Sequence, residues 1–469
     1  MAMGKRRRER QGEIWLPAAA IALVPGHPFY ERLNALLGPQ DFGGFVEGEC
    51  RAFYAERLGR PSLPPAIYFR LLPVGYFEGI DSERGIAWRL ADSLSLRAFC
   101  GYALTETTPD HSTLSRNRRL IAVETHQAVF AWELKRLAEA GLVRGGAIGI
   151  DATTLEANAA LRSLVRRDTG EGYTEYLQGL AAASGIRTPT RAALARLDRR
   201  RKGKASNDDW QNPHDPDARI TKLKDGRTHL AHKAEHAVDL ETEAVLAVTL
   251  QPGDRGDSAS LPETLGQTLE HPAMLAQDEG SPVSAHLVAR LVMDKGYHSN
   301  ATVMLTEALG IRSCCSEPAR GRRHWTGQVA AQRAVHANRR RIRGERGKQL
   351  LHKRGEYLER PFAHCYETGG LRRLHLRGLE NALKRQLIHV AGFNLGLLLR
   401  RLLGSGKPRT AGGRAAALRV SLDRRRSTAN AHSRLYPLLN RLRLPARNSA
   451  PLRPIAGWSC CRPFSATGC

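Results

Sequence analysis

The stretch from His286 to Asn300, HLVARLVMDKGYHSN, constrains the fold of this chain more than any other segment. A mostly apolar run from Leu287 to Met293 leads directly into Asp294, and Gly296 then allows a sharp turn. Short runs rich in Val and Leu that end near Gly predict buried strands. Asp294 is therefore expected at the carboxyl end of a strand, where open α/β sheets place their ligands.

A second stretch, GGAIGIDATTLEANA, has the same design, because its small and apolar run from Ala147 to Ile150 leads into Asp151. Two strands that each end in an aspartate would bring two carboxylates together. We expect a third acid on a helix that packs over the sheet. Glu356 and Glu359 in KRGEYLERPFAH are the candidates, because residues three apart lie on neighbouring parts of one helical face.

The charge of the chain restricts its partners. A net charge of +26 over 469 residues is extreme for an enzyme and indicates a polyanionic partner, with nucleic acid first. The competing reading is a basic membrane-surface protein, which would need an amphipathic basic helix or a lipid anchor. No run of 18 apolar residues exists, so we expect no transmembrane helix, and the apolar patch from Leu16 to Val24 does not fit a signal peptide.

The eight cysteines form no CxxC pair, so the sequence indicates neither a zinc ribbon nor a redox motif, and a reducing cytoplasm fits best. Cys314 and Cys315 are most simply core residues. Three histidines, His229, His232 and His236, would form a metal-binding face only on a helix. Because their segment has the pattern of a strand, we expect packing or DNA contact there instead.

The chain is long enough for two or three domains. Residues 1–26 form a basic leader, and residues 27–143 have helical spacing, with Pro28, Pro64 and Pro65 suited to helix starts. Pro73 is expected to kink or interrupt its helix. Residues 144–404 follow the order βββ-α-β-α-β of an α/β core with an antiparallel start, and a charged insert occupies 162–227.

Beyond residue 404 the character of the chain changes. From Lys407 to Cys469 there are thirteen Arg or Lys residues against one acid, Asp423, which favours disorder. A DNA-binding tail and a frame-shifted end of the gene are the alternatives. The run from Arg199 to Lys204, within the insert, is equally open between a solvated loop and a contact with a nucleic-acid backbone.

A helix-turn-helix is predicted within SLSLRAFCGYALTETTPDHSTLSRNRRLI. A short helix would end at Gly101, and a second helix would be capped near Asp110. Arg116, Arg118 and Arg119 would lie on or near the exposed side of the second helix, where they would contact a major groove or phosphates. A solvated polar helix in an ordinary bundle explains the same pattern.

Taken together, Asp151 in GIDATT, Asp294 in MDKGYHS and Glu359 in YLERPFAH resemble the DDE transposases of bacterial insertion sequences. The resemblance covers residues 27–404 and includes GRPSLPP, TPDHSTLSR, DGRTHLAHKAEHAVD and HVAGFNLGLLLR. It implies an RNase H-like mixed-sheet catalytic core preceded by an all-α N-terminal domain. Related families carry a Tyr, an Arg and a Lys around the glutamate. Here Arg354 lies one residue out of register for the arginine, and Tyr366 stands at the lysine position.

The resemblance implies that Asp151, Asp294 and Glu359 bind two divalent metal ions, Mg²⁺ with Mn²⁺ as a substitute. Hard cations prefer carboxylate oxygens, and a pair of ions about 3.5–4 Å apart would activate the attacking oxygen and stabilise the leaving one. Water would first free a 3′-OH at the element end, and this hydroxyl would then attack target DNA. No covalent enzyme intermediate is needed.

The implied partners are double-stranded DNA, as terminal repeats and target, and a second copy of the chain in a homodimer that holds two ends, with no membrane, in the bacterial cytoplasm at the nucleoid. A nuclease with the same site but no strand transfer, and a DNA-binding relic without catalysis, are the alternatives. The candidate DNA contacts are Arg116, Arg118, Arg119, Lys233, Lys295, Tyr297, Arg339, Arg340, Arg354 and Arg360.

Overall fold

The structure is a computed structural model that describes residues 26–55, 62–200, 206–223, 226–277, 281–284, 286–319, 321, 323–404 and 406–408. These residues lie in one compact unit. Nearly all of the expected basic leader (residues 1–26) and basic tail (residues 405–469), and most of the run from Arg199 to Lys204, lie outside the described residues.

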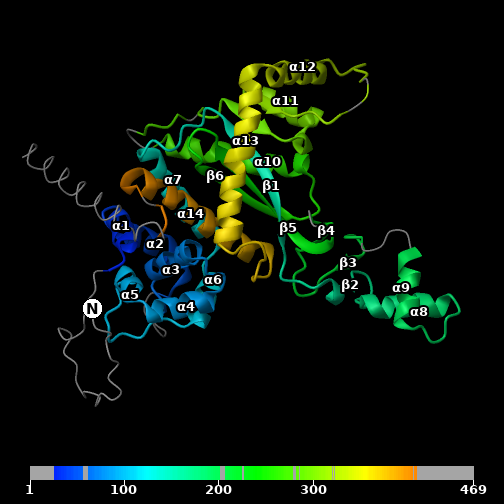
Figure 1. Ribbon diagram of the computed structural model, residues 1–469, viewed down its shortest axis with the longest axis horizontal. Coiled ribbons are helices and arrows are strands. Elements are labelled where there is room, and N and C mark those ends of the chain that lie inside the picture. Colours follow the sequence, from blue (N-terminus) through cyan, green and yellow to red (C-terminus); the bar gives the residue numbers. More distant parts are fainter. Residues whose placement is uncertain are drawn as a thin grey trace, which may run out of the picture. The chain divides into compact units, whose positions relative to one another are not determined.

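The first part of the chain is helical, as its spacing predicts (Figure 1). Pro28 opens the first helix and Pro65 the third, and Asp110 caps the sixth by accepting a hydrogen bond from the Ser112 amide. The third helix runs through Pro73 without interruption, so the expected break is absent; Pro73 is buried, and its neighbours pack in the core. The helices are α1 (Pro28–Leu37), α2 (Phe42–Cys50), α3 (Pro65–Glu78), α4 (Glu83–Asp92), α5 (Leu94–Cys100), α6 (His111–Leu120) and α7 (Val123–Glu139).

A mixed sheet follows, with its antiparallel strands first. The strand order is β4-β5-β1-β7-β8, and β6 also pairs with β5. β5 runs antiparallel to β1, β4 and β6, whereas β7 is parallel to β1 and β8 is parallel to β7. The strands are β1 (Ile148–Glu156), β4 (Arg219–Lys222), β5 (Thr228–Asp239), β6 (Val245–Pro252), β7 (Arg290–Met293) and β8 (Arg312–Cys315).

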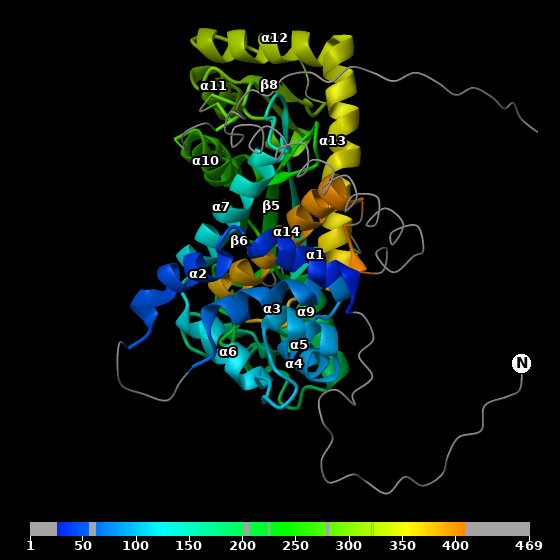
Figure 2. The same cartoon turned by 90° about the vertical axis from the view of Figure 1, so that its left-hand side faces the viewer.

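Helices cover both faces of this sheet, and Figure 2 shows α10 and α13 on opposite sides of it. Gly149 of β1 makes the approach of α13 possible, because a Cβ at this position would lie 2.7 Å from Leu358 Cδ1. On the other face, Ser260 and Thr264 of α10 contact β5. The later helices are α10 (Asp257–Leu275), α11 (Asn300–Ala308), α12 (Val329–Arg343), α13 (Glu345–Ala363), a π-helix (His364–Thr368) and α14 (Leu379–Leu403).

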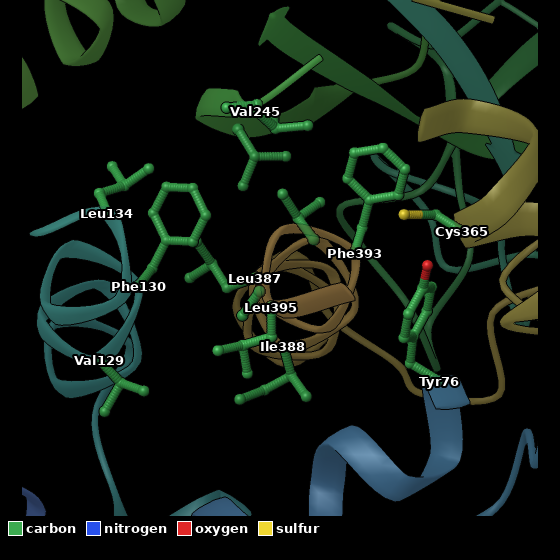
Figure 3. Packing of buried hydrophobic residues seen from close by; sticks show 14 of the residues in the cluster. Tyr76, Val129, Phe130, Leu134, Val245, Cys365, Leu387, Ile388, Phe393 and Leu395 are labelled. Atoms are coloured by element: carbon green, nitrogen blue, oxygen red, sulfur yellow. The ribbon is translucent and has the colours of Figure 1, made fainter. Parts of the chain in front are cut away.

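Helix α14 joins the helical part of the chain to the sheet. It packs against both α7 and β6, and Figure 3 shows Phe130 of α7 and Val245 of β6 next to the helix that carries Leu387 and Leu395. A single hydrophobic cluster therefore runs from α1 through α14 into the sheet. Because burial of apolar area is the main stabilising term in folding, the helical part and the sheet stabilise each other.

The charged insert contains regular structure of its own. A two-stranded sheet of β2 (Val165–Arg166) and β3 (Trp210–Gln211) is joined by α8 (Tyr173–Ala183) and α9 (Arg191–Arg200). Trp210 is buried in a small separate cluster, against which Tyr173 and Tyr176 pack. Strand β4 then returns the chain to the main sheet. Among the described helices, none is long and apolar enough to cross a membrane.

Candidate active site

The two predicted aspartates lie side by side in the sheet. β1 and β7 are parallel neighbours, and Ile150 pairs with Met293, so that Asp151 and Asp294 follow at the same level. Asp294 ends β7, and its carboxylate accepts a hydrogen bond of 2.7 Å from the Lys295 amide at the start of a short 3₁₀ turn (Lys295–Tyr297). The structure thus brings together two carboxylates that are 143 positions apart in the sequence.

Asp151 does not end its strand, which corrects the expectation for the first aspartate. β1 continues to Glu156, because the longer strand β5 supplies antiparallel partners as far as Ala231. Only the parallel pairing with β7 stops before Asp151, and this leaves one edge of β1 without a strand partner there. Asp151 is therefore held on a continuous strand, whereas Asp294 stands at the start of a turn.

Burial raises the pKa of the Asp151 carboxyl above its ordinary value. Arg354 opposes this shift, since its Nη2 lies 2.8 Å from Asp151 Oδ2, while the nearby charges of Asp294 and Asp257 raise the pKa further. Arg354 was expected to contact DNA. In the structure its side chain is only 12% exposed and it neutralises Asp151 instead.

The third predicted acid, Glu359, is exposed on α13, the helix that covers this face of the sheet. Leu358 faces Gly149 of β1, and Tyr357 packs against a cluster that includes Ala147 and Leu240. Successive helix residues are 100° apart, so Glu359 and Tyr357 flank Leu358 on opposite sides. Arg354, one helical turn before Leu358, is the residue of α13 that reaches Asp151.

In the part of the chain that is described, no hydrogen bond or ion pair joins Glu359 to the two aspartates, and no three His, Cys, Asp or Glu side chains are grouped to hold a metal. The other candidate acid, Glu356, pairs with Arg360, which also pairs with Glu243 at the turn between β5 and β6. The assignment of Glu359 as the third acid stays a prediction.

Two further predicted DNA contacts lie in the interior. Tyr297 is fully buried, and its hydroxyl donates a 2.7 Å hydrogen bond to Glu235 of β5. Lys233 is 6% exposed and its Nζ lies 2.6 Å from Asp257 Oδ1. Both residues are therefore structural here, and the expectation that they contact DNA is corrected. Strand alternation places Lys233 and Glu235 on the same face of β5. Charged residues are rarely buried unless they are paired, so this spacing in the sequence was the signal for a buried pair of opposite charges.

The predicted helix-turn-helix has its two helices, and its arginines divide into two groups. Arg116 and Arg119 of α6 are exposed. Arg118 is buried, with its guanidinium 2.6 Å from Glu83 Oε1 and 2.9 Å from Asn381 Oδ1. Arg118 therefore ties α6 to α4 and α14, and the expectation that it contacts DNA is corrected.

The remaining basic candidates lie near the ends of the parallel strands or on α12 and α13. Lys295 and Arg340 are exposed. Arg339 is half-buried and pairs with Glu317, whose pKa is lowered to about 2, chiefly by this hydrogen bond. Lys295 lies next to Asp294 and is the exposed cation closest in sequence to the two aspartates.

We expect Arg354→Gln to lower stability by about 1–2 kcal/mol near pH 7, the range for a partly exposed, charge-assisted hydrogen bond. Arg354 lowers the pKa of Asp151, so the pair contributes stability only where Asp151 is ionised. The loss should therefore shrink as the pH falls through the pKa of Asp151. Urea unfolding of both proteins at pH 7 and at acid pH measures this. An equal loss at both pH values would contradict the ion pair.

Comparison with known families identifies the chain. Residues 19–120 match a family described as a transposase domain (DUF772), and residues 310–399 match one described as a transposase DDE domain. Both matches support a DDE transposase of the insertion-sequence type. The second match contains Arg354 and Glu359 but begins after both aspartates. Searches among curated proteins and among solved structures gave no match.

The family confirms the fold expected for this transposase. The DDE domain implies an RNase H-like fold, and the mixed sheet, with β5 and β6 antiparallel and β7 and β8 parallel, agrees with the predicted βββ-α-β-α-β order. The first match covers α1 to α6, which include the predicted helix-turn-helix. The described cysteines are all unpaired and buried, among them Cys314 and Cys315, as expected for core residues.

Proposed function

We propose that this transposase cleaves DNA at the ends of its element and joins the freed strand to target DNA, with Asp151, Asp294 and Glu359 as its catalytic acids. The observation that carries the proposal is the pairing of β1 with β7, which sets two carboxylates at one level of the sheet. Glu359 is included because its helix covers this face of the sheet and also carries Arg354, which pairs with Asp151.

The donor set suits a hard divalent cation. Both aspartates offer carboxylate oxygens, and their mutual repulsion, which raises the pKa of Asp151, favours a cation between them. Asp151, Asp294 and Glu359 would hold Mg²⁺, or Mn²⁺ in its place. When bound, the metal supplies Lewis-acid activation of the attacking oxygen and stabilises charge on the leaving one.

The side chains around the acids have separate tasks in this proposal. Arg354 holds the Asp151 carboxylate in place through its 2.8 Å contact. Lys295, exposed next to Asp294, attracts the phosphate backbone toward the two acids. Attack by water on the element-end phosphorus releases the 3′-OH, and attack by this hydroxyl on target phosphorus completes the transfer. Neither step needs a covalent bond to the protein.

Cleavage of a labelled duplex that carries the ends of the encoding element tests the proposal. We expect nicking at the end in Mg²⁺, followed by joining to a second DNA. Nicking without joining would indicate a nuclease with the same acids. Binding without cleavage in either Mg²⁺ or Mn²⁺ would indicate a DNA-binding relic. We propose that the protein acts in the bacterial cytoplasm at the nucleoid, as a homodimer that holds two ends.

We further propose that α6 contacts DNA through Arg116 and Arg119. Because each phosphate contact releases condensed counterions, the double variant Arg116→Gln/Arg119→Gln should reduce the slope of log affinity against log salt by about 1.8. Fluorescence anisotropy on the element-end duplex at several salt concentrations measures the slope. The matched control is Arg51→Gln, an exposed arginine of the same region that follows α2. An equal change in the control, or no change in the double variant, would exclude a specific contact by α6.

A further inference from the structure

A buried polar network lies beneath the two aspartates, on the face of the sheet opposite α13. At its centre is Glu235 of β5, which has no exposed surface. Its carboxylate accepts hydrogen bonds from Ser260 Oγ at 2.7 Å, from Thr264 Oγ1, and from Tyr297 Oη at 2.7 Å. A buried carboxylate is costly unless such donors satisfy it, so this site is built around a specific set of partners.

Tyr297 connects this centre to the second aspartate. It is the third residue after Asp294 and lies in the short 3₁₀ turn that Asp294 caps. Its acceptor, Glu235, pairs across the sheet with Ala152, the neighbour of Asp151. One hydrogen bond therefore joins the turn that carries Asp294 to the strand next to the one that carries Asp151.

A second connection reaches the same turn. Lys233 Nζ lies 2.6 Å from Asp257 Oδ1, 2.9 Å from Ser260 Oγ and 3.2 Å from the Arg255 carbonyl oxygen. Asp257 in turn packs against Gly296, where an added Cβ would lie 2.0 Å from Asp257 Oδ2. The start of α10 is therefore hydrogen-bonded to β5 and lies in close contact with Gly296, within the turn that follows Asp294.

The turn needs such support because the backbone ladder ends before it. β7 is four residues long, and its pairing with β1 stops at Met293. Asp294 and Asp151 also repel each other when both are ionised. Hydrogen bonds to charged groups are shorter and stronger than neutral ones, so the Tyr297–Glu235 bond is suited to hold the turn against this repulsion.

We propose that Tyr297 and Glu235 are positioning residues, which set the place of Asp294 relative to Asp151 and thereby the affinity of the pair for a divalent cation. The inference rests on the proposed function in one respect, namely that the aspartates bind such a cation. Neither Tyr297 nor Glu235 is itself a cation ligand in this proposal, because both side chains are fully buried.

The test uses the full-length protein without DNA and Mn²⁺ alone as the probe, with binding measured by calorimetry. Tyr297→Phe removes only the hydroxyl, and we expect about tenfold weaker Mn²⁺ binding, as for other groups that orient metal ligands from behind. The matched control is Tyr30→Phe, which removes the hydrogen bond from another buried tyrosine to a glutamate, Glu78, in the helical part of the chain. It should lower the melting temperature to a similar extent and leave Mn²⁺ affinity unchanged.

A second variant separates hydrogen bonding from charge. Glu235→Gln keeps an oxygen acceptor for the Tyr297 hydroxyl, so we expect its Mn²⁺ affinity to lie closer to that of the native protein than to that of Tyr297→Phe. Equal weakening in Glu235→Gln and Tyr297→Phe would overturn the role given to the hydrogen bond. Equal weakening in Tyr30→Phe would reduce the effect to a general loss of stability and would overturn the proposal.

Amide hydrogen exchange in the metal-free protein tests whether Tyr297 holds the turn, and this test does not depend on the proposed function. Tyr297→Phe should speed exchange in a peptide that covers residues 294–298, and Tyr30→Phe should not. If the native protein binds no Mn²⁺, the proposed function loses its metal site, while faster exchange would still support the anchor of the turn. Unchanged exchange in Tyr297→Phe would overturn the positioning role.

Discussion

Asp294→Asn is expected to reduce cleavage of an element-end duplex by about 10³-fold or more, because loss of a metal-binding carboxylate removes several kcal/mol of transition-state stabilisation. The asparagine keeps an oxygen that accepts the hydrogen bond from the Lys295 amide, so the turn after β7 should fold as in the native protein. Initial rates on labelled duplex in Mg²⁺, with melting temperatures measured in parallel, provide the comparison.

The control for this substitution is Asp208→Asn, which changes an exposed aspartate of the insert in the same way. Its cleavage rate should stay within about twofold of the native rate, since surface substitutions away from a site have little effect. If the Asp294→Asn protein folds and cleaves at the native rate, Asp294 is not a catalytic residue. The pairing of β1 with β7 would then no longer support the proposed function.

Glu359→Gln is expected to lower the cleavage rate by about 10²- to 10³-fold if this residue completes the acid set, again through lost stabilisation of charge at phosphorus. Glu359 is exposed, so the substitution should leave the melting temperature unchanged. A loss of activity in this variant could therefore not be explained by a loss of stability. Substitutions of buried residues in the sheet would change both activity and stability.

Glu356→Gln provides the matched control on the same helix. Glu356 pairs with Arg360, and an exposed pair of this spacing contributes about 0.3–0.5 kcal/mol to stability, so a small loss of stability and full cleavage are expected. The opposite result, with Glu356→Gln inactive and Glu359→Gln active, would assign the third acid to Glu356. Full activity in both would show that α13 does not supply it.

Several features of the site follow from local sequence alone. The apolar run before Asp294 and the glycine after it are sufficient to predict a strand that ends at a turn, and the structure has both. The same holds for the cap at Asp110 and for the hairpin of β5 and β6. These predictions succeed because strand alternation, turn formation and helix capping depend on a few neighbouring residues.

The roles of the basic residues depended on tertiary structure. Arg118 finds Glu83 at a separation of 35 residues and Asn381 at 263, and Arg354 finds Asp151 at 203. Arg118 was predicted to contact DNA from the exposed side of its helix, and Arg354 from its position close to Glu359 in the sequence. Whether such a residue faces solvent or an acid depends on which segments pack together, and no local pattern contains that information.

The sequence by itself determined the order of strands and helices along the chain, the approach of two strand-borne aspartates and the helical start of the chain. Only the tertiary structure decided that β1 continues past Asp151, that Lys233 and Tyr297 are buried, and that Arg354 neutralises Asp151. The physical reason is that strands and caps form from local backbone and side-chain preferences, whereas the partner of a buried charge is set by which elements exclude water together.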